Sequence, residues 1–174
     1  SAKIKKGMPA KVHQMGVRRT SSGKFAARFD GKTLQSSVQL ASELPLQLID
    51  AHSFNLLEGG PSQRRQFLDW GVFHVEQTYG VVWKRFQKAL KQRNQLLRHG
   101  RIEEESLSAW TAELVPLSEQ VSRLRDKYLS GLVKHVREVA RLFDGLGSLD
   151  IEYYQGWSAE TALAEVMSGD KKRD

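Results

Sequence analysis

The dominant feature of the sequence is a stripe of large apolar residues at steps of three and four positions between Glu104 and Phe143. Such steps keep side chains on one face of an α-helix, because the helix has 3.6 residues per turn. A stripe that continues for about ten turns predicts one long helix whose apolar face packs against another element. Its members are Leu107, Trp110, Leu114, Leu117, Val121, Leu124, Tyr128, Leu132, Val136, Val139 and Phe143.

A second, shorter stripe lies between Tyr79 and Arg98. The polar loop between the two stripes is short, which predicts an extended antiparallel helical hairpin. Pro116 lies inside the longer stripe, and because proline lacks an N–H group it is expected to kink this helix or split it near Leu114. The shorter stripe consists of Val82, Phe86, Ala89, Leu90, Leu96 and Leu97.

Shorter elements are expected on either side of the hairpin. Apolar and polar residues alternate around a polar turn at 20–23, which predicts a β-hairpin over residues 11–29. The fold class predicted is therefore α+β, mainly α: the extended helical hairpin with a small antiparallel β element. The remaining expected elements are a helix at Ser37–Leu44 stopped by Pro45, a buried strand at Leu46–Ile49, a helix through Leu57 capped by Asp50, a helix from Pro61 to about Val75, a strand at Leu149–Gln155, and a helix at Ala159–Met167 capped by Ser158.

Composition narrows the classes of protein. With 174 residues, 40% of them hydrophobic, the chain suits one domain or one lobe with a modest attachment. No stretch of about 18 apolar residues is present, so no membrane span is expected. The chain has no cysteine and its five histidines include no i, i+4 pair, which argues against disulfides and metal sites and favours a cytoplasmic protein. The net charge of +7 favours anionic partners.

Two compact motifs lie between Gly59 and Arg98. Residues 60–69 read Gly-Pro-x-x-Arg-Arg-x-Phe-Leu-Asp, and residues 90–94 read Leu-Lys-x-Arg-Asn. In this order and at this spacing the motifs resemble the bacterial RecF family, recombination mediators that are ATPases related to the SMC-type ABC proteins. The similarity continues through Leu44–Ile49, Phe54–Leu57, the LVPLSEQ of residues 114–120 and the YQGW of residues 154–157.

The resemblance implies that the chain is a central fragment of a RecF protein. Residues 1–50 then belong to the ATPase lobe, 51–148 form the helical second lobe, and 149–174 are a return strand and helix. By the same resemblance the whole protein binds ATP with Mg²⁺ and DNA, dimerises across the nucleotide, and with RecO and RecR helps to load RecA at single-strand gaps. Two other interpretations are a stand-alone helical interaction module with a basic face and an independent enzyme.

The ATPase motifs of the family are not in this sequence. Gly31-Lys32-Thr33 ends like a P-loop, but the first glycine that the phosphate cradle requires is replaced by Ala26. Asp30-Gly31 instead predicts a hairpin turn. Leu46–Asp50 resembles a Walker B strand, but Ala51 occupies the position of the acidic catalytic residue. No signature motif, nucleophile or carboxylate pair is apparent either, so the fragment itself is expected to have no catalytic activity, cofactor or metal.

Cations gather on the polar faces of both predicted long helices. At about 100° per residue each group falls within an arc of roughly 80°. Such ridges suit contacts to DNA phosphates without sequence preference, and they also suit the solvated face that any amphipathic helix needs. The ridges consist of Lys84, Lys88, Lys91 and Arg98 on the first helix, and Arg123, Lys127, Lys134, Arg137 and Arg141 on the second.

Arg64 and Arg65 lie at a predicted helix start, where the helix dipole disfavours positive charge. DNA phosphate is one candidate partner for them. The interpretation we favour for at least one is an ion pair with Asp50, Glu58 or Asp69. Among the aromatic residues, Trp83 is the best candidate for stacking on a base, whereas Phe67, Trp70 and Phe73 are expected in the core. The family usually has Pro-Glu where this chain has Ala51-His52, and His52 is expected to be packed or solvated.

Overall fold

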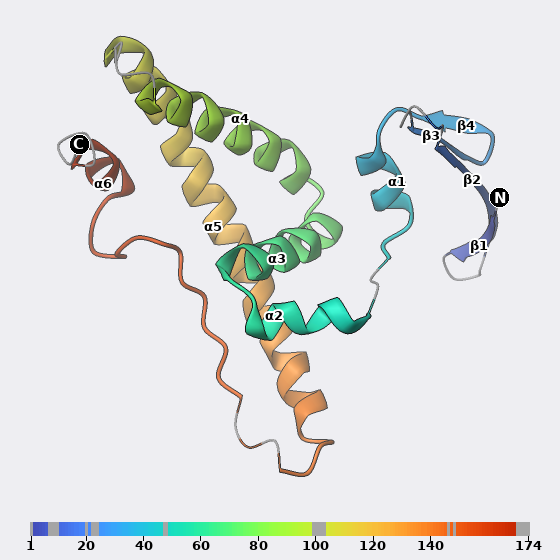
Figure 1. Cartoon of the computed structure of the whole chain (residues 1–174). Helices are drawn as coiled ribbons and strands as arrows, with labels where there is room; N and C mark the ends of the chain where they lie inside the picture. The colour runs from blue at the N-terminus through green and yellow to red at the C-terminus, as the bar shows by residue number, and fades with distance from the viewer. Residues whose placement is uncertain are drawn as a thin grey trace. The chain divides into compact units, whose positions relative to one another are not determined.

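Figure 1 shows the computed structural model of the chain, which describes residues 2–6, 11–19, 21, 25–46, 49–98, 104–145, 147 and 149–169. The chain forms two compact units, Ser1–Ser53 and Phe54–Asp174. The predicted α+β, mainly α fold class is confirmed. The elements are β1 (Ala2–Lys6), β2 (Lys11–Arg19), β3 (Phe25–Phe29), β4 (Lys32–Leu34), α1 (Ser37–Glu43), the 3-10 turn η1 (Ala51–Phe54), α2 (Asn55–Glu58), α3 (Pro61–Val75), α4 (Tyr79–Arg98), α5 (Glu104–Ala140) and α6 (Leu163–Gly169).

The first unit is an antiparallel meander in the order β1-β2-β3-β4, with α1 against β3 and β4. The predicted hairpin over residues 11–29 is the β2–β3 pair, and β1 was not expected. Asp30 and Gly31 join β3 to β4 with positive φ angles of 47° and 78°, as a type I′ turn requires. The expected hairpin turn at Asp30-Gly31 is therefore confirmed.

The Asp30 carboxylate also fastens this turn to β2. Its Oδ2 lies 2.6 Å from the His13 Nδ1, and its Oδ1 accepts a 2.8 Å hydrogen bond from the Gln14 N–H. These two hydrogen bonds, that to His13 first, lower the pKa of the Asp30 carboxyl below its ordinary value. The turn thus carries its own side-chain partner in the neighbouring strand.

The segment after the sheet departs from expectation. The helix predicted at Ser37–Leu44 is confirmed as α1, and the Ser36 hydroxyl caps it by accepting the Gln39 N–H at 3.2 Å. The buried strand expected at 46–49 is wrong where the chain is described: Leu46 and Ile49 are exposed and lie in no strand, while residues 47 and 48 lie outside the described part. A strand needs a hydrogen-bonded neighbour, and no described strand pairs with this segment.

The second unit is built on three helices that follow directly from the sequence. Gly60 precedes α3 and Pro61 occupies its first turn, where a missing N–H costs nothing. α3 ends at Val75, and after a short break the chain turns into α4. α4 and α5 pack along their length with opposite chain directions, as pairs such as Arg85–Glu113 and Arg93–Thr111 show. The predicted antiparallel helical hairpin is confirmed.

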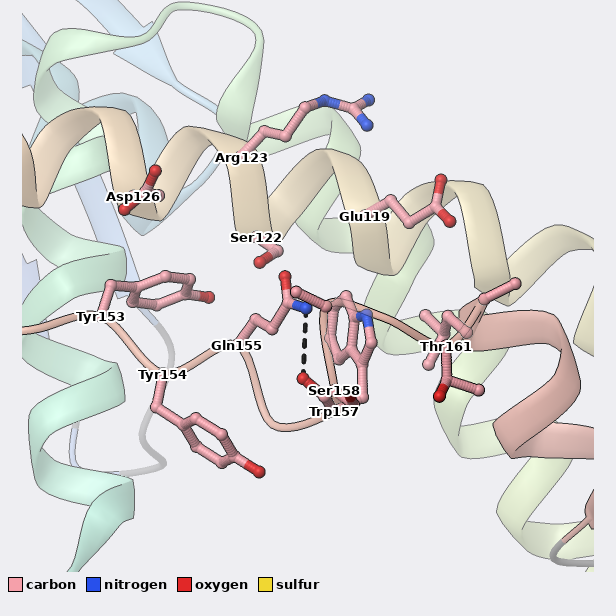
Figure 2. Close-up of a pocket in the computed structure, with 13 residues that line it drawn as sticks. Glu119, Ser122, Arg123, Asp126, Tyr153, Tyr154, Gln155, Trp157, Ser158 and Thr161 are labelled. Atoms are coloured by element: carbon pink, nitrogen blue, oxygen red, sulfur yellow. Dashed lines mark hydrogen bonds between the residues drawn. The ribbon is translucent and has the colours of Figure 1, made fainter.

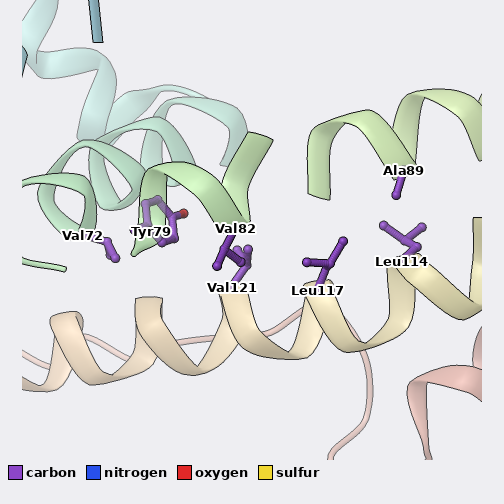
Figure 3. Close-up of a cluster of buried hydrophobic side chains, with 7 residues drawn as sticks. All are labelled: Val72, Tyr79, Val82, Ala89, Leu114, Leu117 and Val121. Atoms are coloured by element: carbon purple, nitrogen blue, oxygen red, sulfur yellow. The ribbon is translucent and has the colours of Figure 1, made fainter. Parts of the chain in front are cut away.

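The core of this unit lies between α4 and α5 and extends under α3 (Figure 3). α5 spans about 55 Å and α4 about 30 Å, so α4 covers only part of the long apolar stripe and α3 covers more. Towards the end of α5 the stripe loses cover: Val139 and Phe143 are exposed, and the helix ends at Ala140 rather than Phe143. The buried cluster consists of Val72, Tyr79, Val82, Ala89, Leu114, Leu117 and Val121.

Pro116 does not divide the long helix, since α5 runs without a break from Glu104 to Ala140. The expected split near Leu114 is therefore wrong. The ring of Pro116 lies on the exposed side, whereas Leu114 and Leu117 on either side of it are buried against α4. Packing of the flanking leucines thus stabilises the helix across the position where the backbone hydrogen bond is missing.

Gly71 allows α3 to approach α5 closely. A Cβ atom at this position would lie 2.2 Å from Cζ of Tyr128, a distance that real carbon contacts do not show. A side chain at position 71 would therefore require the Tyr128 ring to move, so glycine here serves helix packing rather than a turn.

The return segment, residues 149–169, contains less regular structure than expected. No strand forms at 149–155, because none of the described residues offers a hydrogen-bonding neighbour. The final helix begins at Leu163 instead of Ala159, and the Ser158 hydroxyl accepts the Glu160 N–H at 3.2 Å within a turn that precedes it. Leu163 is buried and Met167 packs against the core, which sets where α6 lies.

Replacing a core leucine tests the packing of the hairpin. Leu114→Ala should lower the free energy of unfolding by about 2–5 kcal/mol, because Leu114 is fully buried and the change leaves a cavity. Val139→Ala, on the same helix but 54% exposed, should cost less than about 0.5 kcal/mol. Urea unfolding followed by circular dichroism measures both. Equal losses at the two positions would contradict the packing described here.

Candidate nucleic-acid interface

The cations of α4 form one exposed face. Lys84, Lys88, Lys91 and Arg98 are all exposed, on the side opposite the buried Val82 and Ala89. None of the four forms an ion pair with a residue that the structure describes, and the Lys88 ammonium lies 5.8 Å from the centre of the Trp110 ring. We call these four residues the α4 cationic face. Its charge is open to solvent and uncompensated by carboxylates of the described chain.

The cations of α5 are differently placed. Lys127 pairs with Glu76 at 2.5 Å, and Arg137 pairs with Asp150 at 3.3 Å. The first pair joins α5 to the break between α3 and α4, and the second holds the return segment against α5. Arg123 borders a groove, Lys134 is exposed without a described ion-pair partner, and Arg141 lies beyond the end of the helix. The second predicted ridge is thus partly used for contacts within the chain.

Arg64 and Arg65 have separate environments, although both are exposed. The Arg64 Nη1 donates to the Gly59 carbonyl at 2.8 Å and to the Leu56 carbonyl at 3.4 Å, at the end of α2. A cation is favourable there because carbonyl groups point out of a helix C-terminus. Neither arginine forms an ion pair among the described residues, so the expected pairing with Asp50, Glu58 or Asp69 is wrong.

The Asp69 carboxylate holds three helices together. It lies on α3 and accepts two hydrogen bonds from Arg125 of α5, at 2.7 Å from Nε and 2.9 Å from Nη2. From α4 it accepts one hydrogen bond from the Tyr79 hydroxyl and a 3.2 Å bond from the Trp83 Nε1–H. We call this arrangement the Asp69 junction.

Burial and pairing with Asp69 together shift the pKa of two members of the Asp69 junction. Burial first, and then the hydrogen bond to Asp69, raise the pKa of Tyr79 well above that of a free tyrosine. Burial of Arg125 opposes its charge, but its hydrogen bonds and charge pairing with Asp69 raise the pKa of the guanidinium overall. Tyr79 therefore stays a hydrogen-bond donor and Arg125 stays charged across the ordinary pH range. Both residues are thus kept in the state that donates hydrogen bonds to Asp69.

Arg93 forms a second three-helix contact. Only 7% exposed, it donates from Nε to the Thr111 hydroxyl of α5 at 3.2 Å and from Nη2 to the Met167 carbonyl in the last turn of α6 at 3.1 Å. Its residue type favours the surface, although position 93 falls within the apolar stripe of this helix, and sequence reasoning missed this residue. The signal that was present is the fixed Arg in the Leu-Lys-x-Arg-Asn motif, which here has a structural role.

The remaining sequence candidates offer no chemistry of their own. Trp83 is half-buried, packs against the core and donates its indole N–H to Asp69, which indicates a structural role, and its stacking on a base stays a prediction. Phe67, Trp70 and Phe73 are partly buried, as expected, and His52 is exposed. Among the described residues there is no cluster of His, Asp and Glu able to hold a metal ion, and no helix long and apolar enough to cross a membrane.

The two arginines at the start of α3 provide a matched test. Arg64→Ala should lower the free energy of unfolding by about 1 kcal/mol, because it removes the side chain that caps two carbonyls of α2. Arg65→Ala should change it by less than about 0.5 kcal/mol. Thermal and urea unfolding of both variants measures the difference. A larger loss for Arg65→Ala would show that the assignment of roles is reversed.

Comparison with known proteins shows which proteins this chain is similar to. No family model matches the chain. It is 46% identical over 164 residues to the DNA replication and repair protein RecF of Azotobacter vinelandii, a match that covers 94% of this chain and 45% of the relative. It is 45% identical over 160 residues to RecF of Pseudomonas aeruginosa, covering 92% of this chain and 43% of the relative. The chain thus spans less than half the length of these curated relatives.

A solved structure shares the fold. It is titled "Structure of the recombination mediator protein RecF-ATPrS in RecFOR pathway" and matches with a TM-score of 0.68 at 19% identity. The match covers 76% of this chain and 37% of that chain. At this identity the likeness concerns the fold alone.

Proposed function

Because the chain belongs to the RecF family, we propose that it is part of a protein that binds ATP and DNA and supports the loading of RecA at single-strand gaps during recombinational repair. The relatives named above carry a role in DNA replication and repair in their names. Within this chain we assign DNA contact to the α4 cationic face. The observation that carries the assignment is the exposed row of four cations without carboxylate partners in the described chain.

The chemistry of this face suits phosphates rather than bases. Lys84, Lys88 and Lys91 present point charges along one side of a rigid helix, and Arg98 extends the row to the end of α4, about 21 Å from Lys84. Cations of this kind release the counterions condensed on DNA, so their contribution to binding falls as salt rises. Contacts to phosphate position a protein on DNA without reading its sequence. Arg65, Lys134 and Arg141 are further candidates, since the structure gives them no ion pair among the described residues.

The other activities proposed for the whole protein rest on family membership. ATP and Mg²⁺ would bind to parts of the protein that carry the P-loop, signature and Walker B motifs, which the 174 residues do not contain. By the same reasoning we propose RecR and RecO as partners and a homodimer formed across the nucleotide. The pathway name printed with the solved RecF structure is consistent with such partners.

Charge reversal tests the α4 cationic face. The triple change Lys84→Glu, Lys88→Glu and Lys91→Glu should weaken binding to short duplexes by about tenfold or more at low salt, equally for unrelated sequences. It should also reduce the slope of log affinity against log salt by about 2–3, because each lost phosphate contact removes about one. Fluorescence anisotropy over a salt series measures both quantities.

A control variant with the same change in net charge distinguishes binding by the α4 cationic face from general electrostatic attraction. Lys11→Glu, Arg18→Glu and Arg28→Glu change exposed cations of the first unit, and like the α4 triple they bring the net charge from +7 to +1 (7 − 6 = 1). This control should keep most of the duplex affinity. The assignment fails if the two triple variants bind equally, or if the α4 triple binds as the unchanged chain does. In the full-length protein the α4 triple should leave ATP binding intact.

A further inference from the structure

A groove of about 690 Å³ lies between α5 and the segment that leads into α6 (Figure 2). One wall is a single face of α5, since its lining positions follow helical spacing. The other wall is the extended chain at 153–163, and Tyr153, Tyr154 and Trp157 give it an aromatic character. Both walls belong to the second unit.

The charge of this groove differs from that of the rest of the chain. Glu119 and Asp126 flank Ser122 along α5, and neither carboxylate forms an ion pair with a described residue. Arg123 lies between them at spacings that would allow pairing, but Figure 2 shows its side chain turned away from the aromatic wall. In a chain of net charge +7 the groove is thus lined by two carboxylates and one guanidinium, which gives it a net negative charge.

The floor of the groove carries an unused polar group. Ser122 is only 6% exposed, and its side chain makes no hydrogen bond with any described residue, whereas the neighbouring Ser118 donates to the Leu114 carbonyl at 2.8 Å. Figure 2 shows the Ser122 hydroxyl directed toward Gln155 across the groove. The Ser122 hydroxyl is therefore available for a hydrogen bond with a group bound in the groove.

These features select one kind of occupant. Aromatic faces contact the aliphatic stems and cationic heads of arginine and lysine, and the carboxylates at the rim pair with those heads. The Ser122 hydroxyl can accept a hydrogen bond from a guanidinium or a backbone N–H. A phosphate backbone is disfavoured here by the two carboxylates, and the volume exceeds what a single small cation fills.

We propose that this groove binds a basic segment, rich in arginine or lysine, of a partner protein. The exposed Tyr154 ring, 80% accessible, lies at its open side and packs on the bound segment. The site is separate from the α4 cationic face, so one lobe offers a cationic surface to nucleic acid and an acidic, aromatic one to protein. The assignment does not depend on DNA binding.

Peptide titration tests the groove. The chain should bind a fluorescently labelled peptide of alternating arginine and glycine, and not one of alternating glutamate and glycine. Glu119→Gln with Asp126→Asn should weaken binding of the basic peptide about tenfold, the usual scale for lost charge pairs. Glu104→Gln with Glu105→Gln changes the same charge in the exposed first turn of α5 and should weaken it less than about twofold.

Three further readouts keep the result interpretable. Tyr154→Ala changes a mostly exposed side chain, so it should fold normally and still weaken peptide binding. Trp157→Phe should remove a change in tryptophan fluorescence that accompanies peptide binding. The Glu119–Asp126 variant should bind duplex DNA at least as well as the unchanged chain. The proposal is overturned if the basic peptide does not bind, if both carboxylate pairs weaken it equally, or if the groove variant loses DNA instead.

Discussion

The carboxylate of Asp69 is the point at which the three long helices of this lobe are held in one arrangement. It lies on α3 and receives hydrogen bonds from Tyr79 and Trp83 of α4 and a two-bond fork from Arg125 of α5. Apolar packing between α4 and α5 is non-directional and would tolerate small shifts along the stripe. A partly buried carboxylate that is costly to leave unpaired does not tolerate them. The junction therefore sets the register in which the core closes and the direction in which the α4 cationic face points.

Some cations of the second unit stabilise its fold, and others are available to bind partners. Arg125 and Arg93 are withdrawn into three-helix contacts, and Lys127 and Arg137 bridge α5 to neighbouring segments. The four residues of the α4 cationic face form no ion pair with a described residue. In this division, the motif residues Asp69 and Arg93 stabilise the packing of the helices. They fix a rigid helix whose opposite side is left for phosphate, while the acidic groove beside α5 faces a different kind of partner.

Much of this lobe was predictable from local patterns. Glycine, proline and helical periodicity placed α3, α4 and most of α5. In the first unit, the positive-φ turn at Asp30-Gly31 likewise followed from residue type. The Asp69 junction was not predictable, because its partners lie 10, 14 and 56 positions away and meet only through the register of helix packing. Alternation at 149–155 indicated a strand, yet a strand also requires a neighbour. Which cations are paired likewise depended on Glu76 and Asp150, which belong to other segments.

A double-mutant cycle between Asp69 and Arg125 tests the central claim most directly. The single variants Asp69→Ala and Arg125→Ala and the double variant are unfolded in urea, and the coupling free energy is taken from the four stabilities. If the junction holds the helices together, each single change is strongly destabilising and the double change costs much less than their sum. We expect a coupling of about 1.5–3 kcal/mol. A coupling near zero would contradict the account and leave apolar packing alone to set the arrangement of α3, α4 and α5.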